Sequence, residues 1–332
     1  MLQRASADAG AVPTHRHSGP LAKLSAHRRY NAAVARDLCK DPDTVAVGRR
    51  IHNCAPRIGV EIQLRDGEEP ETKLVSGNLC NARLCPMCEW RRTRVWRKRL
   101  ISGLEAFHLD YPTWKPIFLT LTVKNVELRH LRETIQEMNR SWSRLTKTAN
   151  YPTEMWFRRT EVVISASRRP TGSAGDPYMA HPHFHCLLLV PPAYFSRNYL
   201  SQRKWQEMWA MAARLDYAPV VDVRRARSKS TTGSSDMSPL TAASLEAAKY
   251  ASKATNLLEL GESISDFHRQ VAGLRFYSVS KQLSEYIKAT DVDAEAMLDE
   301  STSAVEMNHE IVKATAQWFE DQNEYLFVDI EP

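Results

Sequence analysis

The chain lacks any long hydrophobic run. Within its 332 residues, no uninterrupted apolar segment approaches the roughly 20 residues that a helix needs to cross a bilayer. The first residues are basic, but the apolar stretch of a secretory signal does not follow them. We therefore expect a cytoplasmic protein without membrane contacts. The length allows one large domain, or a domain with a smaller accessory module.

Basic residues are almost absent from the end of the chain. Residues 289–332 contain twelve Asp or Glu and only Lys313 as a base, a net charge of −11. Because the whole chain carries +6, the preceding residues carry +17. A body this basic favours a polyanionic partner, with nucleic acid as the first candidate. The alternative is a solvated basic surface without a partner.

Cysteines are too sparse for a disulfide framework, since there are only six. Three of them nevertheless form a C-x4-C-x2-C cluster: Cys80, Cys85 and Cys88. Thiolates grouped in this way in a reducing cytoplasm are typical of tetrahedral structural zinc. Cys54 is our first choice for the fourth ligand, with His52 and Cys39 as competitors. We interpret Cys186 as a small buried residue.

A histidine cluster precedes an apolar run. His181, His183 and His185 alternate with Pro182 and Phe184 and lead into the run 186–190. Side chains alternate between faces along a strand, so the three imidazoles can point the same way. Imidazole is a common ligand of divalent transition metals, and two of them supply two corners of a coordination shell. Alternatively, these are ordinary histidines where a strand begins at Pro182.

Hydrophobic periodicity and turn residues divide the chain into four parts. We expect a partly disordered N-terminal part, a zinc-binding segment with a basic helix, a main domain and an acidic tail, over residues 1–50, 51–110, 111–288 and 289–332. The expected helices are 21–40, 89–109, 128–148 and 200–214. The expected strands are 58–64, a second extended segment that leads to Cys80, 116–123, 156–167, the histidine strand and 220–223.

The expected helix 89–109 is rich in bases and contains tryptophans. Its candidate DNA contacts are Arg91, Arg92, Arg94, Arg97 and Lys98. Arg and Lys can neutralise phosphates, while Trp can stack on bases or pack inward. The alternative is an amphipathic helix with Trp90 and Val95 in the core and a solvated basic face.

An alanine-rich segment, 241–254, favours a helix with four functional groups on one face. Glu246, Lys249, Tyr250 and Lys253 have the spacing i, i+3, i+4 and i+7. Neighbouring cations stabilise a phenolate and can assist its attack on a phosphodiester, and a carboxylate one turn away can orient or deprotonate a water. The alternative is an exposed helix face with Glu–Lys and Glu–Tyr contacts.

Three segments in this order resemble the motifs of plasmid rolling-circle replication initiators, whose nuclease domains belong to the HUH endonuclease superfamily. The segments are 118–125 (FLTLTVKN), 181–185 (HPHFH) and 246–253. The resemblance covers residues 50–285. It implies an α+β domain with a central, largely antiparallel sheet, helices mainly on one face and a zinc-bearing segment before it.

The resemblance also implies roles for particular residues. His183 and His185 match the metal-binding pair, and the metal would be magnesium or manganese. Tyr250 matches the nucleophile that nicks one strand at the double-strand origin, stays linked to the 5′-phosphate and leaves a 3′-hydroxyl primer. Glu246 matches the carboxylate of the single-Tyr branch, which ends replication by Glu-assisted hydrolysis. Lys249 and Lys253 would add cations at the phosphate.

Two imidazoles hold a hard cation poorly, so a third ligand is needed. We prefer Glu161, on the strand before the histidine strand, to His181. The alternative for Glu161 is an exposed edge-strand charge. Thr120 and Thr122 are expected to shape the sheet without a catalytic role.

The expected partner is plasmid origin DNA, double-stranded and as an extruded single strand. A host helicase or polymerase and a homodimer are further expectations. The acidic tail either competes with DNA or recruits a host replication protein, or is a solubilising, partly helical extension. The alternative functions are an HUH transposase or relaxase, and a non-catalytic zinc-stabilised DNA-binding repressor. No G-x4-GK-[ST] motif is present, which disfavours a fused motor.

Overall fold

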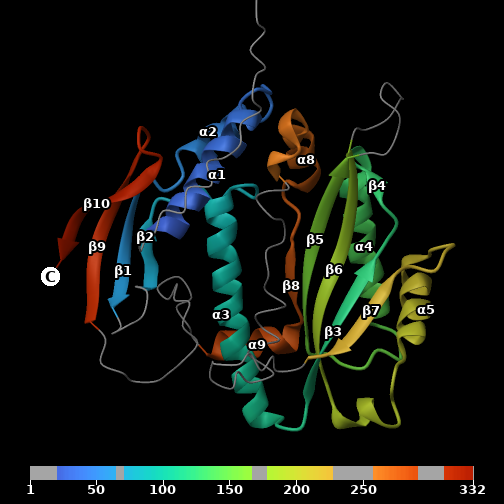
Figure 1. The fold of residues 1–332 in the computed structure, drawn as a ribbon. Coiled ribbons are helices and arrows are strands. Elements are labelled where there is room, and N and C mark those ends of the chain that lie inside the picture. Colours follow the sequence, from blue (N-terminus) through green and yellow to red (C-terminus); the bar gives the residue numbers. More distant parts are fainter. Residues whose placement is uncertain (1–20, 65–70, 167–177, 227–256, 291–309, 332) are drawn as a thin grey trace, which may run out of the picture.

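The computed structural model describes residues 21–64, 71–166, 178–226, 257–290 and 310–331. Two antiparallel sheets stand on either side of the long helix α3 (Pro86–Asp110) (Figure 1). Buried apolar residues from the first sheet, from α3 and from the second sheet belong to one core cluster. The expected α+β fold with a mostly antiparallel sheet is confirmed.

The first sheet combines the zinc-binding segment with the end of the chain. Its strands are β1 (Arg57–Leu64), β2 (Glu71–Gly77), β9 (Glu310–Phe319) and β10 (Glu324–Glu331), in the order β10-β9-β1-β2. Ile58, Val60 and Ile62 alternate toward the core, and all eight residues of β1 pair with residues 310–317 of β9. The prediction of a separate acidic tail over 289–332 was therefore wrong, since residues 310–331 form a hairpin of this sheet.

Buried side chains attach this hairpin to the N-terminal helix α1 (Ala22–Leu38) and to the residue after Cys54. The Tyr325 hydroxyl donates to Ala55 O at 2.5 Å, and the Tyr325 amide donates to Ser25 Oγ at 3.0 Å. The buried Arg28 guanidinium lies over the Trp318 ring, 5.2 Å from its centroid. Buried residues of the acidic hairpin, among them Trp318 and Tyr325, thus attach it to the rest of the protein.

The second sheet has the strand order β7-β3-β6-β5-β8, and a short strand, β4, also pairs with β6. Its strands are β3 (Lys115–Thr122), β4 (Val126–Glu127), β5 (Trp156–Ala166), β6 (Tyr178–Val190), β7 (Val221–Arg225) and β8 (Tyr277–Val279). Every pairing is antiparallel. The histidine segment is thus a central strand, with its partners β3 and β5 on both sides.

Two helices cover one face of the second sheet: α4 (Leu131–Leu145) and α5 (Gln202–Ala213). Apolar residues of α4 recur at helical spacing, which directs Ile135, Met138 and Trp142 inward. Met138 and Trp142, together with Trp205 and Trp209 of α5, belong to a core cluster that includes Phe184 and Cys186. Cys186 is therefore a buried packing residue, as expected.

The opposite face of the second sheet is partly covered by α3, whose Trp96 ring lies 5.6 Å from Phe157 and from Tyr277. The remaining helices of the described residues are α2 (Val45–His52), α8 (Ile264–Val271) and α9 (Lys281–Ala289), with single 3₁₀ turns at Leu128–His130, Pro192–Phe195 and Gly261–Ser263. Among the described residues, none of the helices has the length and apolar character to cross a bilayer.

Candidate metal centres and nucleic-acid interface

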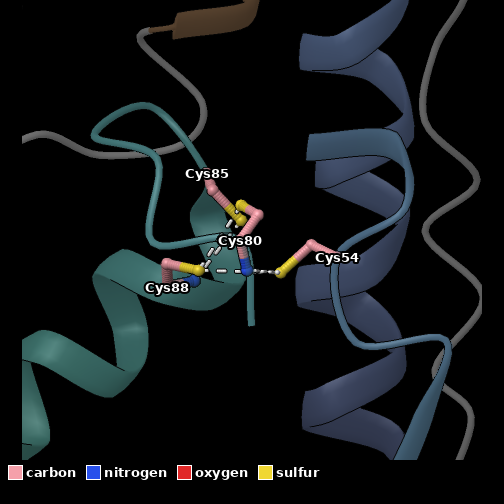
Figure 2. A group of neighbouring side chains, drawn as sticks. All are labelled: Cys54, Cys80, Cys85 and Cys88. Carbon is pink, nitrogen blue, oxygen red and sulfur yellow. Dashed lines mark hydrogen bonds between the residues drawn. The ribbon is translucent and has the colours of Figure 1, made fainter. Parts of the chain in front are cut away.

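Four cysteines converge where α3 begins. Ligand atoms of Cys54, Cys80, Cys85 and Cys88 all lie within 4.8 Å of one another (Figure 2). The Cys88 sulfur is 3.6 Å from those of Cys54 and Cys80. Ligands around zinc with Zn–S bonds of about 2.3 Å form a tetrahedron with edges of about 3.8 Å, so the group fits a tetrahedral thiolate site.

Backbone amides support the thiolate character of this group. Cys80 N donates to the Cys54 sulfur at 3.4 Å, and Asn81 N donates to the Cys88 sulfur at 3.2 Å. Cys85 precedes Pro86 as the N-cap of α3, and its sulfur accepts from Cys88 N at 3.5 Å. The knuckle therefore fixes two sulfurs and starts the helix at the same place.

The thiols also affect one another's ionisation. Hydrogen bonds from the Cys54, Cys85 and Cys88 thiols lower the pKa of Cys80 far below its usual value. Burial raises the pKa of Cys85 well above its usual value, and the neighbouring thiols raise it further. Buried thiolates repel one another, so a divalent cation is what would allow all four sulfurs to be ionised together.

The competing zinc ligands lie elsewhere. The Cys39 thiol is directed toward Val45 O, at 3.9 Å, and neither Cys39 nor His52 is part of the group. Cys54 is therefore the fourth sulfur, as the sequence predicted.

A second group of ligands lies on the second sheet. The β5–β6 register places Glu161 opposite His183 and Arg159 opposite His185. Side chains at opposite positions of an antiparallel pair share a face, and His185 follows His183 on that face after one intervening residue. Glu161 Oε2 is 2.9 Å from His185 Nε2 and 3.7 Å from His183 Nε2. We call these three residues the Glu–His group.

The electrostatics keep the carboxylate of this group ionised. Burial by itself would raise the pKa of Glu161, but hydrogen bonds from His183 and His185 and the charge of Arg159 outweigh burial and hold the pKa well below its usual value. Arg159 is only 2% exposed and forms an ion pair with Glu161. An ionised carboxylate with two adjacent imidazoles is a donor set suited to a divalent cation.

His181 is not part of the Glu–His group. Its Nδ1 lies 2.6 Å from Asn125 Oδ1, and the group of possible metal ligands contains only Glu161, His183 and His185. Of the two third ligands considered from the sequence, the geometry thus favours Glu161 over His181.

Residues of β3 line the other side of the histidine strand. Thr120 stands opposite His185, and its hydroxyl is 3.3 Å from His185 Nδ1. Thr122 stands opposite His183, but its hydroxyl donates to Val220 O at 2.8 Å. Thr120 can therefore orient an imidazole, whereas Thr122 holds the chain segment before β7.

The basic helix is largely a structural element. In α3, Arg94 is buried and its guanidinium lies 4.6 Å from the centre of the Trp90 ring. Arg92 forms an ion pair with Glu89. The expectation that Arg94 contacts DNA was wrong, because cation–π packing holds it inside. Arg91, Arg97 and Lys98 are half-buried, and each interacts with neighbouring residues.

The expected helix face with Glu246, Lys249, Tyr250 and Lys253 lies outside the described residues.

Sequence reasoning missed a set of buried residues that join α3 to the second sheet. The Tyr277 hydroxyl donates to Glu89 Oε1 at 3.0 Å, and Tyr277 stands opposite Arg159 in the β5–β8 pair. The only sequence signal was a charged residue next to Cys88 in an otherwise buried helical turn.

Comparison with known proteins agrees with these features. A family model described as "Replication protein" matches residues 71–326, which include three of the four grouped cysteines, the Glu–His group and most of the C-terminal hairpin. The chain belongs to this family. The match therefore includes strands of both sheets and is not limited to the histidine strand.

Individual relatives are similar over most or half of their length. The chain is 29% identical to the "Protein rep" of Lentilactobacillus hilgardii over 273 residues, which cover 78% of this chain and 82% of that protein. It is 28% identical to the "Protein rep" of Streptococcus pneumoniae serotype 2 over 78% of each chain. With the "Protein rep" of Bacillus amyloliquefaciens, identity is 36% over 54% of this chain and 50% of that relative. No solved structure matches the chain.

The resemblance of this replication protein to plasmid replication initiators is thereby confirmed, and it supports an initiator role that involves origin DNA.

Proposed function

We propose that this replication protein nicks one strand of a plasmid double-strand origin and later rejoins or releases it. The proposal rests on the family to which the chain belongs and, above all, on the geometry of the Glu–His group. Three ligand groups converge on one sheet face, and the His185 side chain is 35% exposed, so a phosphate can approach them. The substrate would be the single strand extruded from the duplex origin.

The Glu–His group fits a manganese or magnesium ion. Ligands at about 2.1 Å from an octahedral cation are about 3.0 Å apart, close to the 2.9 Å between Glu161 Oε2 and His185 Nε2. Such a cation, when bound, polarises the phosphate oxygens and stabilises the charge that develops during attack. Arg159 would hold Glu161 in the orientation that it needs as a ligand.

Tyr250 is the proposed nucleophile, on the strength of the sequence motif. Its phenolate oxygen forms a bond to phosphorus while the bond from phosphorus to the 3′ oxygen breaks, and the 3′ oxygen takes up a proton. The products are a 5′-phosphotyrosine and a free 3′-hydroxyl primer, with no oxidation or reduction. Lys249 and Lys253 would favour the phenolate by their positive charge.

Glu246 is the residue proposed to assist the hydrolysis that ends replication. In the helix expected from the sequence, its carboxylate would lie one turn from Tyr250; there it would take a proton from water, and the hydroxide would attack phosphorus and release the tyrosine. The Cys54–Cys80–Cys85–Cys88 group would hold structural zinc, and bases that include Arg91, Arg97 and Lys98 would contribute to binding of origin DNA. A host helicase or polymerase and a homodimer remain part of this proposal.

A cleavage assay tests the function. Supercoiled plasmid that carries the origin, incubated with the protein and manganese, should give nicked circles with covalently attached protein. Tyr250→Phe should abolish both products, whereas Tyr199→Phe should retain them, because Tyr199 is an exposed residue after β6. Glu246→Ala should still nick but should accumulate covalent complexes.

Two alternatives have distinct outcomes. If the wild-type protein binds origin DNA but never nicks it or becomes attached to it, the protein is a zinc-stabilised repressor. If it nicks and joins the ends of a mobile element or a transfer origin instead, it is an HUH transposase or relaxase. Equal loss of first-strand nicking in Glu246→Ala would contradict the separate role of Glu246.

A further inference from the structure

Arg275 is an exposed base just before β8, which is the edge strand beside β5 in the second sheet. The β5–β8 pairing runs through Arg159 and Tyr277, and a backbone hydrogen bond of 2.7 Å from Thr160 N to Phe276 O continues it. Continued by one more residue, this register would place residue 275 opposite Glu161. Side chains at such positions begin roughly 5 Å apart on one face of the sheet.

Two arginines thus flank Glu161 on this face, and they differ in what they contact. The buried Arg159 is paired with Glu161. In the described part of the chain, the Arg275 side chain forms no hydrogen bond or ion pair. None of the described residues therefore occupies its guanidinium, and a cation beside a metal-ligand group suits an anion that bridges the two.

The segment that carries Arg275 is held by the cysteine-rich loop. Arg83, between Cys80 and Cys85, donates to Leu274 O at 2.9 Å, and its guanidinium lies 4.7 Å from the centre of the Phe276 ring. The residues on either side of Arg275 are thus fixed by one side chain of the proposed zinc loop. Arg83 therefore connects the proposed zinc loop to the segment that carries Arg275.

We propose that Arg275 binds a backbone phosphate of the single-stranded DNA next to the phosphate at the Glu–His group, and that Arg83 is the positioning residue for Arg275. This inference rests on the proposed function for the identity of the ligand. Since a phosphate contact does not depend on base sequence, the site recognises the DNA backbone and contributes affinity, not sequence preference.

Binding without cleavage provides the test. A short fluorescein-labelled single-stranded DNA is titrated with full-length protein, without added divalent cation, and anisotropy is measured over a series of salt concentrations. Arg275→Ala should weaken binding about tenfold at low salt, the loss expected for one charge-assisted hydrogen bond. The slope of log K against log salt should fall by about 0.7, as expected for one phosphate contact fewer.

The control is Arg57→Ala, because Arg57 is exposed on β1 in the other sheet. It should change neither affinity nor slope by a comparable amount, and Arg275→Lys should keep most of the slope. Unchanged binding by Arg275→Ala, or an equal loss in Arg57→Ala, overturns the proposal. Because no cleavage is measured, a protein that binds but never nicks would overturn the proposed function alone.

A double-mutant cycle tests the role of Arg83. Arg83→Met should weaken DNA binding in the wild-type background with zinc content unchanged, and should have little further effect in the Arg275→Ala background. Additive losses of affinity would show that Arg83 acts independently of Arg275 and would overturn its positioning role.

Discussion

Glu161 of β5 stands directly opposite His183 of β6, and the two side chains emerge on the same face of the second sheet. His185 is the next residue of β6 on that face, and its Nε2 lies 2.9 Å from Glu161 Oε2. A single strand pairing therefore creates the whole Glu–His group, so its metal affinity should depend on these side chains and not on His181.

His185→Ala should lower the affinity for manganese by more than about tenfold, since loss of even an outer-shell partner of a metal ligand costs about 10–100-fold. His181→Ala is the matched control and should retain manganese binding, because His181 Nδ1 is paired with Asn125. Electron paramagnetic resonance of free manganese measures both affinities. An equal loss in the two variants would contradict the ligand set.

Cys85→Ser should reduce the zinc content and lower the melting temperature, because Cys85 is both a sulfur of the cysteine group and the N-cap of α3. Cys39→Ser should change neither, as Cys39 lies outside this group. Metal analysis of purified protein and thermal unfolding give the two readouts. Retained zinc in Cys85→Ser would remove the structural zinc site.

Tyr325→Phe should lower the free energy of unfolding by about 1–3 kcal/mol, because Ala55 O loses its buried hydrogen-bond donor. Tyr199→Phe should stay within about 0.5 kcal/mol of wild type, since Tyr199 is 62% exposed. Urea denaturation measures both. A value near zero for Tyr325→Phe would show that the C-terminal hairpin is not fixed through this contact.

Stability should fall on acidification in part because of His27. Burial, with a smaller effect from the Arg94 charge, lowers the pKa of His27 to about 4, from 6.5. Between pH 4 and pH 6.5 the unfolded chain therefore binds more protons than the folded one. The contribution of His27 to the free energy of unfolding is complete above pH 6.5 and is lost as pH falls toward 4.

The matched variant is His27→Gln, whose melting temperature should decrease less than that of wild type between neutral and mildly acidic pH. Acid release of zinc affects both proteins, so the difference between the two curves isolates the histidine. Parallel curves would show that His27 does not couple folding to protons.

Short-range patterns predicted several parts of the molecule correctly. The C-x4-C-x2-C spacing identified three sulfurs that the structure brings together, because a tight knuckle needs only neighbouring residues. Alternation along the histidine strand placed His183 and His185 on one face, since side-chain direction in a strand follows from the backbone. Helical periodicity likewise located α4 and α5.

The basic residues of α3 show that composition was a poor guide to which residues face DNA. Their charge suggested a DNA-binding face, yet Arg94 packs on Trp90 and Arg92 pairs with Glu89. The acidic end of the chain misled in the same way, because its charges conceal strands whose inward residues, such as Ala316 and Tyr325, are buried. Net charge describes the solvated surface of a protein, and it says little about which strands pair or which charged side chains form ion pairs.

By itself, the sequence determined the local units: the sulfur knuckle, the alternating histidines and the amphipathic helices, whose geometry needs only neighbouring residues. Tertiary structure alone decided that β9 pairs with β1, that Glu161 stands directly opposite His183, and that Arg83 reaches the segment around Arg275. These contacts join residues far apart in the chain, and strand register and core packing set them, which no local pattern encodes.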